Sequence, residues 1–404
     1  MKLPIYMDNP STTRLDDRVL EAMMPYFTEV YGHAASRNHE FGWDAEKAVD
    51  TAREQIAELT GATPKEIIFT SGGTESNNLA IKGVASMYKE KGNHIITCSI
   101  DQKAILDPCK RLEREGYQVT YLPVDRYGVI NPDEIEAAIT DDTILITTML
   151  ANNEIGTIQP ITAIGQIAKK RKVVFHVDAV HAAGKIPIDV NEMGIDLLSL
   201  TGHLVYGPKG IGALYVRRKR PRVRLTPIFE GGGHERGLRS GTINVPGAVG
   251  FGKACELSLE VMESEAERLR AMRGRLEGNI LSRNEEVFVN GHVEQRLPGI
   301  CNISFAYIEG EGMMMAIKEI AVASGSACTS SSLEPSHVLK GLGVGEDLAH
   351  TSIRFGLGRY NTEEEVDYTA DLVHEAVNKL REMSPLYEMA MEGIDITAIE
   401  WPED

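Results

Sequence analysis

The fold of this chain is decided by a short apolar run that ends in a carboxylate, VVFHVD (residues 173–178). Short runs of apolar and β-branched residues are typical of strands that are buried on both faces of a sheet. Comparable runs occur at residues 66–70, 94–99, 118–124, 143–149, 196–200 and 212–216. Stretches with apolar residues at helical spacing lie between them, at 45–59, 103–115 and 161–170. This alternation predicts an α/β domain with a mostly parallel, seven-stranded sheet covered by helices on both faces.

The alternation of strand-like and helix-like stretches ends after Gly252, which predicts a second, smaller domain. A long charged helix is expected over residues 263–276, followed by strands at 286–289 and 301–305 and a helix at 363–381. A chain of 404 residues is long enough for one large domain and one small one. We therefore expect a large α/β domain over residues 15–260, and an α+β domain built from residues 1–14 and 261–404.

The overall charge argues against a nucleic-acid partner. The formal net charge is -17, and a surface of that sign repels phosphate backbones. The one basic run, RRKRPR (residues 217–222), is interpreted as a solvated turn after a strand. The N-terminal residues do not resemble a secretion signal, and no stretch is apolar enough to cross a bilayer. The sequence thus predicts a cytoplasmic protein without a membrane partner.

Five cysteines lie far apart and form no C-x-x-C pair, so neither a disulfide framework nor a zinc ribbon is indicated. Cys98 falls in an expected strand and Cys255 in an expected helix, where a thiol is usually buried and inert. Cys328 lies instead in SGSACTSSSLEP (residues 324–335), among small and polar residues. Such surroundings predict an exposed and reactive thiol.

A phosphate-binding turn is suggested by TSGGTESNN (residues 70–78), which follows one expected strand and opens a helix. Glycines such as Gly73 let the backbone approach an anion, amides at the helix start point toward it, and Thr74 adds a hydroxyl donor. Turns of this composition are common, and an ordinary turn without a ligand is the alternative interpretation.

Asp178 lies at the carboxyl end of its strand, which is where open α/β sheets bind ligands. A carboxylate there needs a cationic partner, and in vitamin B6 enzymes that partner is the pyridinium nitrogen of the cofactor. Capping of the next helix is one alternative. A metal site of His176, Asp178 and His181 is another, although strand geometry places only the first two on one face.

About twenty residues later the chain reads SLTGHLVYGPKG (residues 199–210), in which Thr201 and His203 complete an anion cradle. An aspartate followed by S-G-H-K and then Y-G-P-K-G is the pattern of the cysteine desulfurases of housekeeping iron-sulfur cluster assembly, which are fold-type I pyridoxal phosphate enzymes. The chain resembles this family, but it has Leu204 where the family has its Schiff-base lysine. Lys209 belongs to the G-P-K-G turn and is a poor substitute because of its position.

The resemblance extends over nearly the whole chain. It includes residues 70–76, NNEIG (152–156), GGGHE (231–235) with RSGT (239–242), the Cys328 loop, SIRF (352–355) and residues 384–401. It implies L-cysteine as the substrate, a substrate carboxylate bound by Arg354, and a persulfide on Cys328. The cofactor-binding residues that it implies are Gly73, Thr74, Asn153, Asp178, His181, Thr201, His203 and Thr242.

Departures from the family pattern fall within the implied site. Gln102 stands where the family has the histidine that stacks on the cofactor ring, and His181 stands where it has a glutamine that binds the ring oxygen. The early Tyr-Ser-Ala segment reads NPS (residues 9–11), and Thr201 replaces a serine, which is a mild change. Gln102 and Leu204 together remove the ring stack, the covalent anchor and the catalytic base.

Two hypotheses about function remain. In the first, the protein is an active cysteine desulfurase that converts cysteine to alanine and carries the sulfur on Cys328; Leu204 argues against this. In the second, it has lost desulfuration and acts as a sulfur relay or cluster-assembly partner, with pyridoxal phosphate absent or held noncovalently. A transaminase-like enzyme is excluded, because it also needs the lysine.

Both hypotheses imply the same partners. The resemblance implies a homodimer, in which Thr242 of the partner subunit completes the phosphate site. It also implies that an iron-sulfur cluster scaffold protein docks on the Cys328 loop and on residues 384–404. Because a thiolate is a natural iron ligand, Cys328 is also a candidate transient ligand of a shared iron-sulfur cluster.

Overall fold

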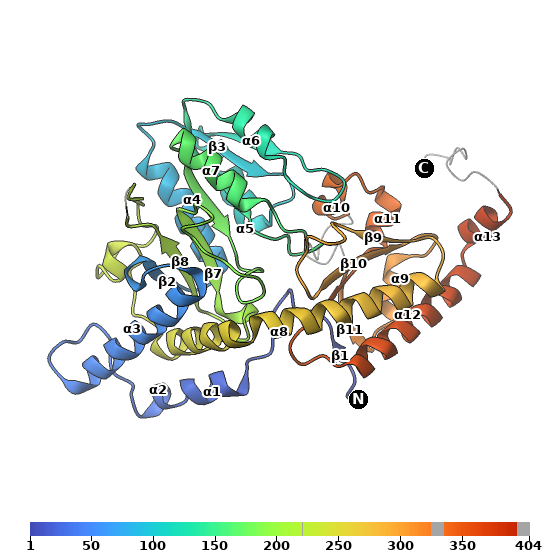
Figure 1. Cartoon of the computed structure of the whole chain (residues 1–404), viewed down its shortest axis with the longest axis horizontal. Helices are drawn as coiled ribbons and strands as arrows, with labels where there is room; N and C mark the ends of the chain where they lie inside the picture. Colours follow the sequence, from blue (N-terminus) through green and yellow to red (C-terminus); the bar gives the residue numbers. More distant parts are fainter. Residues whose placement is uncertain (220, 325–334, 394–404) are drawn as a thin grey trace.

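The structure is a computed structural model that describes residues 1–219, 221–324 and 335–393. The larger part of the molecule is built on a seven-stranded sheet (Figure 1). The order of its strands is β2-β8-β7-β6-β5-β3-β4. The strands from β7 to β4 run parallel, whereas β8 is antiparallel to both β7 and β2. The bounds are β2 Ile67–Thr70, β3 His94–Cys98, β4 Gln118–Leu122, β5 Thr143–Met149, β6 Val174–Asp178, β7 Leu197–Thr201 and β8 Gly212–Val216. The predicted mostly parallel, seven-stranded sheet is confirmed.

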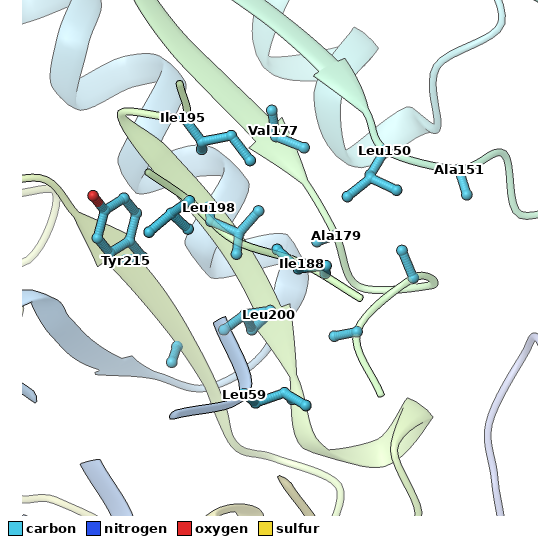
Figure 2. Close-up of a cluster of buried hydrophobic side chains, with 14 of the residues drawn as sticks. Leu59, Leu150, Ala151, Val177, Ala179, Ile188, Ile195, Leu198, Leu200 and Tyr215 are labelled. Atoms are coloured by element: carbon cyan, nitrogen blue, oxygen red, sulfur yellow. The ribbon is translucent and has the colours of Figure 1, made fainter. Parts of the chain in front are cut away.

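Both faces of this sheet are buried over most of its width, because every residue of β2, β3, β5, β7 and β8 is buried. One large apolar cluster includes Val177, Leu198, Leu200 and Tyr215, shown in Figure 2, and a second cluster lies around Leu79, Ile95 and Leu145. The helices of this domain are α1 Asp17–Met23, α2 Pro25–Thr28, α3 Glu40–Thr60, α4 Gly73–Met87, α5 Lys103–Arg114, α6 Pro132–Ala138 and α7 Ile161–Arg171. Short 3-10 turns are η1 Pro64–Glu66, η2 Gly202–Leu204 and η3 Glu235–Gly237.

The smaller part of the molecule is built on an antiparallel sheet with the order β12-β13-β10-β9. A two-stranded parallel sheet joins β1 near the N-terminus to β11. The strands are β1 Ile5–Tyr6, β9 Val287–Asn290, β10 Ile300–Phe305, β11 Ile320–Ala321, β12 Ala323–Ser324 and β13 Ile353–Gly356. The helices are α9 Gly310–Ala316, α10 His337–Gly341, α11 Glu346–His350, α12 Glu363–Glu382 and α13 Pro385–Met391. A separate apolar cluster fills this part, as an α+β arrangement requires.

One long helix, α8 Val245–Arg283, joins the two parts (Figure 1). Its first half packs in the large core through Phe251 and Leu257, and its second half packs in the small core through Leu269 and Leu276. The expected boundary at residue 260 therefore falls inside a continuous helix, and the exact division into domains stays a prediction.

Candidate active site

The phosphate-type turn joins the end of β2 to the start of α4. A Cβ at Gly73 would lie 2.6 Å from Val180 Cγ1, so this position has no room for a side chain. Thr201 Oγ1 is buried without a hydrogen-bond partner, and it lies 3.9 Å from where a Cβ on Gly72 would be. An unpartnered hydroxyl beside the amides of a helix N-terminus is suited to an anion.

Asp178 ends β6 as a buried carboxylate that accepts three hydrogen bonds. Val180 N donates to Oδ1 at 3.0 Å, Asn77 Nδ2 donates to Oδ2 at 2.6 Å, and Gln102 Nε2 donates to the same Oδ2. Burial raises the pKa of Asp178, while these three donors act to lower it. Two amides thus share the carboxylate oxygen at the floor of the site.

Gln102 is held in this position by the turn that contains Asp101. The Asp101 carboxylate is buried and accepts hydrogen bonds from Thr97 Oγ1, Cys98 N, Thr148 Oγ1 and Met149 N. Burial raises the pKa of Asp101 to about 6. Because four donors fix this turn between β3 and α5, the Gln102 amide meets Asp178 from a rigid support.

Leu204 lies in the 3-10 turn η2, directly after the carboxyl end of β7. Its side chain is 2% exposed. His203 beside it faces the N-terminal segment, where its Nδ1 lies 3.2 Å from Thr12 Oγ1 and its carbonyl accepts a hydrogen bond from Thr13 Oγ1 at 2.8 Å. Lys209 is exposed. Position 204 therefore offers no amine and no proton-transfer group to the site.

Arg354 is the buried cation of the site. Arg354 Nη2 donates to Asp8 Oδ1 and to Ser11 Oγ, each at 2.7 Å, and Nη1 donates to Asn153 O at 3.0 Å. Arg354 Nε is buried without a partner. A substrate carboxylate would therefore compete with Asp8 for this guanidinium.

The His181 imidazole is kept uncharged by its surroundings. Burial, and then the positive charges of Lys185, Arg354 and His203, place the pKa of His181 well below its ordinary value. Its Nδ1 is buried and has no hydrogen-bond partner. A neutral ring with a free nitrogen can accept or donate one hydrogen bond to a ligand.

Several of the predicted site residues lie in contact in pairs. Gln102 contacts Asp178, Thr201 lies beside the phosphate-type turn, and Asn153 contacts Arg354. Thr242 lies exposed in the loop before α8, and its expected role in the partner subunit's phosphate site stays a prediction. Cys328 and residues 394–404 lie outside the described residues.

The remaining cysteines behave as expected from their positions. Cys98 and Cys255 are buried, and burial raises the pKa of each thiol. Cys109 and Cys301 are buried in the same way, and the pKa of Cys109 is raised to about 12. None of these four thiols is therefore suited to sulfur chemistry.

The metal interpretation of the strand-end histidines is not supported. Both ring nitrogens of His176 are engaged, Nδ1 with Thr147 Oγ1 at 2.7 Å and Nε2 with Ser199 Oγ at 2.9 Å. Within residues 1–219, 221–324 and 335–393, no group of three or more His, Cys, Asp or Glu side chains is placed to hold a metal ion.

Sequence reasoning missed three residues of the site: Asn77, Asp8 and Glu154. Asn77 lies one helical turn after Gly73, so the helical period already places it on the face above the strand ends. Asp8 precedes the altered segment 9–11, and its contact with Arg354 joins chain positions 346 residues apart. Glu154 belongs to the NNEIG stretch; burial raises its pKa to about 7, and its Oε1 has no partner.

Comparison with known proteins identifies the family. The aminotransferase class-V family model matches residues 5–369. A protein described as cysteine desulfurase IscS from Anaeromyxobacter dehalogenans (strain 2CP-C) is 58% identical over 401 residues, with 99% of each chain covered. The protein of the same description from Pectobacterium carotovorum subsp. carotovorum (strain PC1) is 57% identical over 403 residues, again covering 99% of both chains. The chain belongs to the IscS-type cysteine desulfurases of iron-sulfur cluster assembly.

Solved structures agree with this assignment. A structure described as a NifS-like protein superposes with a TM-score of 0.87 at 38% identity, covering 93% of this chain and 100% of the other. The fold is therefore that of the fold-type I pyridoxal phosphate enzymes. In the described ranges, no helix has the length and apolar character needed to span a bilayer.

Pyridoxal phosphate is the cofactor of this family, but only part of the site fits it. The turn at residues 70–74 and the unpartnered Thr201 hydroxyl suit its phosphate. The ring end fits less well, because the Gln102 and Asn77 amides both donate to Oδ2 of Asp178, the carboxylate that would pair with a protonated ring nitrogen. The aldehyde end has no amine at Leu204. The residues present therefore do not fit a covalently held cofactor.

Proposed function

We propose that this protein serves iron-sulfur cluster assembly as a sulfur relay, and that it does not desulfurate cysteine itself. The observation that carries the proposal is the buried Leu204 at the position of the Schiff-base lysine. The contact of Gln102 with Asp178 supports it, because it closes the ring end of the same site. Pyridoxal phosphate, if it binds, is held noncovalently at residues 70–74.

The chemistry of the relay requires only Cys328 and a persulfide donor. The Cys328 thiolate attacks the outer sulfur of a donor persulfide, forming a new S–S bond while the donor's S–S bond breaks. The donor leaves as a thiolate, and Cys328 becomes the persulfide, so no external oxidant or reductant is needed. In a second step of the same kind, an acceptor thiolate attacks the outer sulfur of the Cys328 persulfide, and Cys328 leaves as a thiolate.

The partners follow the family resemblance. We propose a homodimer in the cytoplasm and a cluster scaffold protein that docks on the Cys328 loop and on residues 384–404. The described part of this tail supports docking, since Leu386 and Met391 on α13 are exposed apolar side chains, as is Met383 before it. Cys328 is in addition the proposed transient ligand of a cluster shared with the scaffold.

Two assays of the purified protein decide between relay and desulfurase. Incubated with pyridoxal phosphate, L-cysteine and a reductant, the protein should release no sulfide. Incubated with a persulfide donor, it should gain one sulfur on Cys328, detected by mass spectrometry and absent in Cys328→Ala. Sulfide release with turnover in the first assay would establish the active desulfurase instead.

A second experiment tests the reason for the loss. We expect Leu204→Lys alone to give little covalent cofactor adduct after borohydride reduction, because Asp178 remains bonded to Gln102. Combining Leu204→Lys with Gln102→His should give an adduct at position 204, located by peptide mass spectrometry. Leu204→Met is the matched control without an amine. Full labelling of the single variant would show that Gln102 does not close the site.

A further inference from the structure

The N-terminal turn, residues 8–11, lies on Arg354, the residue that the family resemblance assigns to the substrate carboxylate. Ser11 N donates to Asp8 O at 3.0 Å, which closes the turn. The two side chains also bond to each other, because the Ser11 hydroxyl donates to Asp8 Oδ1 at 2.9 Å. Asp8 and Ser11 therefore reach Arg354 as one hydrogen-bonded unit.

Both residues contact the same nitrogen of the guanidinium group. Nη2 has two hydrogens, and it donates to Asp8 Oδ1 and to Ser11 Oγ, each at 2.7 Å. A carboxylate binds a guanidinium bidentately along one of two edges, either through Nη1 and Nη2 or through Nε and Nη2. Each edge needs one hydrogen of Nη2, so both edges are occupied. Within the part of the chain that the structure describes, the buried Nε of Arg354 has no partner, which allows one single hydrogen bond but no bidentate pair.

The charge of Arg354 is balanced as well. The side chains of Arg354 and Asp8 are 6% and 23% exposed, so their ion pair lies largely away from solvent, where charges are weakly screened. An incoming carboxylate would meet a guanidinium whose charge Asp8 already balances. Displacing Asp8 would in turn leave its carboxylate partly buried without a partner.

The N-terminal turn is fixed against β13 and the residues that follow this strand. A Cβ at Gly356 would lie 1.9 Å from Pro10 Cδ, and a Cβ at Gly358 would lie 2.4 Å from Asn9 Oδ1. Asn9 Nδ2 also donates to Gly356 O at 2.8 Å. Residues 9–11, which differ from the Tyr-Ser-Ala segment of the family, therefore each contact an alternate residue of this one stretch.

We infer that Asp8 and Ser11 are specificity-determining residues that exclude an amino-acid carboxylate from Arg354. Ser11 is the decisive one, because it stands where the family has an alanine, and an alanine has no hydroxyl to occupy Nη2. The protein thus lacks the binding site for cysteine as well as the amine to react with it. The inference deepens the proposed function and rests on it, since it concerns the same site and the carboxylate that the family resemblance assigns to Arg354.

Titration calorimetry with L-alanine, an unreactive amino acid, measures this exclusion directly. Ser11→Ala frees one edge of Arg354 and should lower the dissociation constant of L-alanine about tenfold, the factor that corresponds to one hydrogen bond to a charged group. Ser11→Thr keeps the hydroxyl and is the matched control, which should bind as the parent protein does. Alaninamide, which lacks the carboxylate, should bind no more tightly to Ser11→Ala than to the parent protein.

Asp8→Asn tests the other side chain of the turn, because the amide removes the charge that balances Arg354. It should also strengthen L-alanine binding, and circular dichroism shows that each variant is folded. The gain in Ser11→Ala should vanish when Arg354→Gln is added. Equal binding of L-alanine by the parent protein, Ser11→Ala and Asp8→Asn would overturn the inference, and so would a gain that survives Arg354→Gln.

The titrations and the relay assays can fail separately, because L-alanine carries no sulfur. If the parent protein binds L-alanine through Arg354 as tightly as Ser11→Ala does but releases no sulfide from cysteine, the exclusion is wrong and the relay stands. If Ser11→Ala shows the expected gain but the parent protein releases sulfide, the relay fails, and Ser11 remains a residue that weakens carboxylate binding.

Discussion

Leu204 suits its surroundings as an apolar residue, and this makes the loss of the lysine hard to reverse by one substitution. The side chain is 2% exposed at the end of a strand that is buried along its whole length. An ammonium group buried there without a partner would carry a desolvation penalty.

Glu154 gives a prediction about pH at the scale of one residue. Burial raises its pKa from 4.5 to about 7, so between these values the folded protein holds a proton that the unfolded chain has released. Stability should therefore fall as pH rises from about 4.5 to 7, by up to about 3 kcal/mol. Urea unfolding at several pH values measures this slope, and Glu154→Gln should remove the Glu154 contribution, leaving the smaller part from Asp101, whose pKa is raised to about 6 by burial.

The exposed Glu90 provides the matched control for this experiment. Glu90→Gln replaces the same carboxylate by the same amide on the surface, and it should leave the slope unchanged. A Glu154→Gln profile parallel to that of the parent protein would show that the Glu154 carboxyl ionises freely in the folded state.

Strand-end position and the family resemblance together predict several side chains of the candidate site, but not how they contact one another. Asp178 was predicted from its strand-end position, and Gln102 and Leu204 were identified as departures from the family pattern. The hydrogen bond from Gln102 to Asp178 depends on the rigid Asp101 turn, which is fixed by donors from two other strands. Contacts of this kind join distant parts of the chain, and no local pattern encodes them.

At the scale of elements, α8 contains glycines in two opposite environments. A Cβ at Gly252 would lie 2.6 Å from Ala52 Cα in α3, whereas a Cβ at Gly278 would meet no atom within 4 Å. Gly252→Ala should therefore destabilise the protein by about 1–3 kcal/mol, because the two helix backbones must move apart. Gly278→Ala should stabilise it by up to about 1 kcal/mol, because alanine restricts the unfolded chain.

Thermal or urea unfolding of the two alanine variants checks this prediction. Both changes add one methyl group to the same helix, so helix propensity alone would shift both in the stabilising direction. A stabilising effect of Gly252→Ala would mean that α3 and α8 are not in close contact at this point.

The sequence predicts the bounds of some helices and strands more accurately than those of others, and the differences have physical causes. The sheet strands were placed within two residues, because buried strands are continuous apolar runs. The helix expected at 263–276 is in fact the end of α8, which begins at Val245. The first half of α8 faces the large core and its second half faces the small core. The apolar residues of α8 therefore follow no single stripe along the helix, and their helical periodicity in the sequence is interrupted. The antiparallel direction of β8 depends on its neighbours and not on its own residues.

At the scale of the whole molecule, α8 is the structural member that both cores share. Phe251 and Leu257 belong to the large apolar cluster, and Met272 and Ile280 belong to the small one. Arg359 strengthens the junction by pairing with Glu265 on α8 and with Asp16 before α1. A straight α8 therefore lets each core stabilise the other.

Ser264→Pro should weaken this coupling, because Ser264 is an exposed residue of α8 between the two packed halves. Proline removes one helical hydrogen bond and clashes with the preceding turn, at a cost of about 3 kcal/mol or more. Amide hydrogen exchange should then rise more in β10 and β13, in the small core, than in β5 of the large sheet. Ser264→Ala keeps the helix and should leave both unchanged. An equal rise in all three strands would mean that the cores open together even when α8 is kinked, and that other contacts, such as the Arg359 ion pairs, hold them in one cooperative unit.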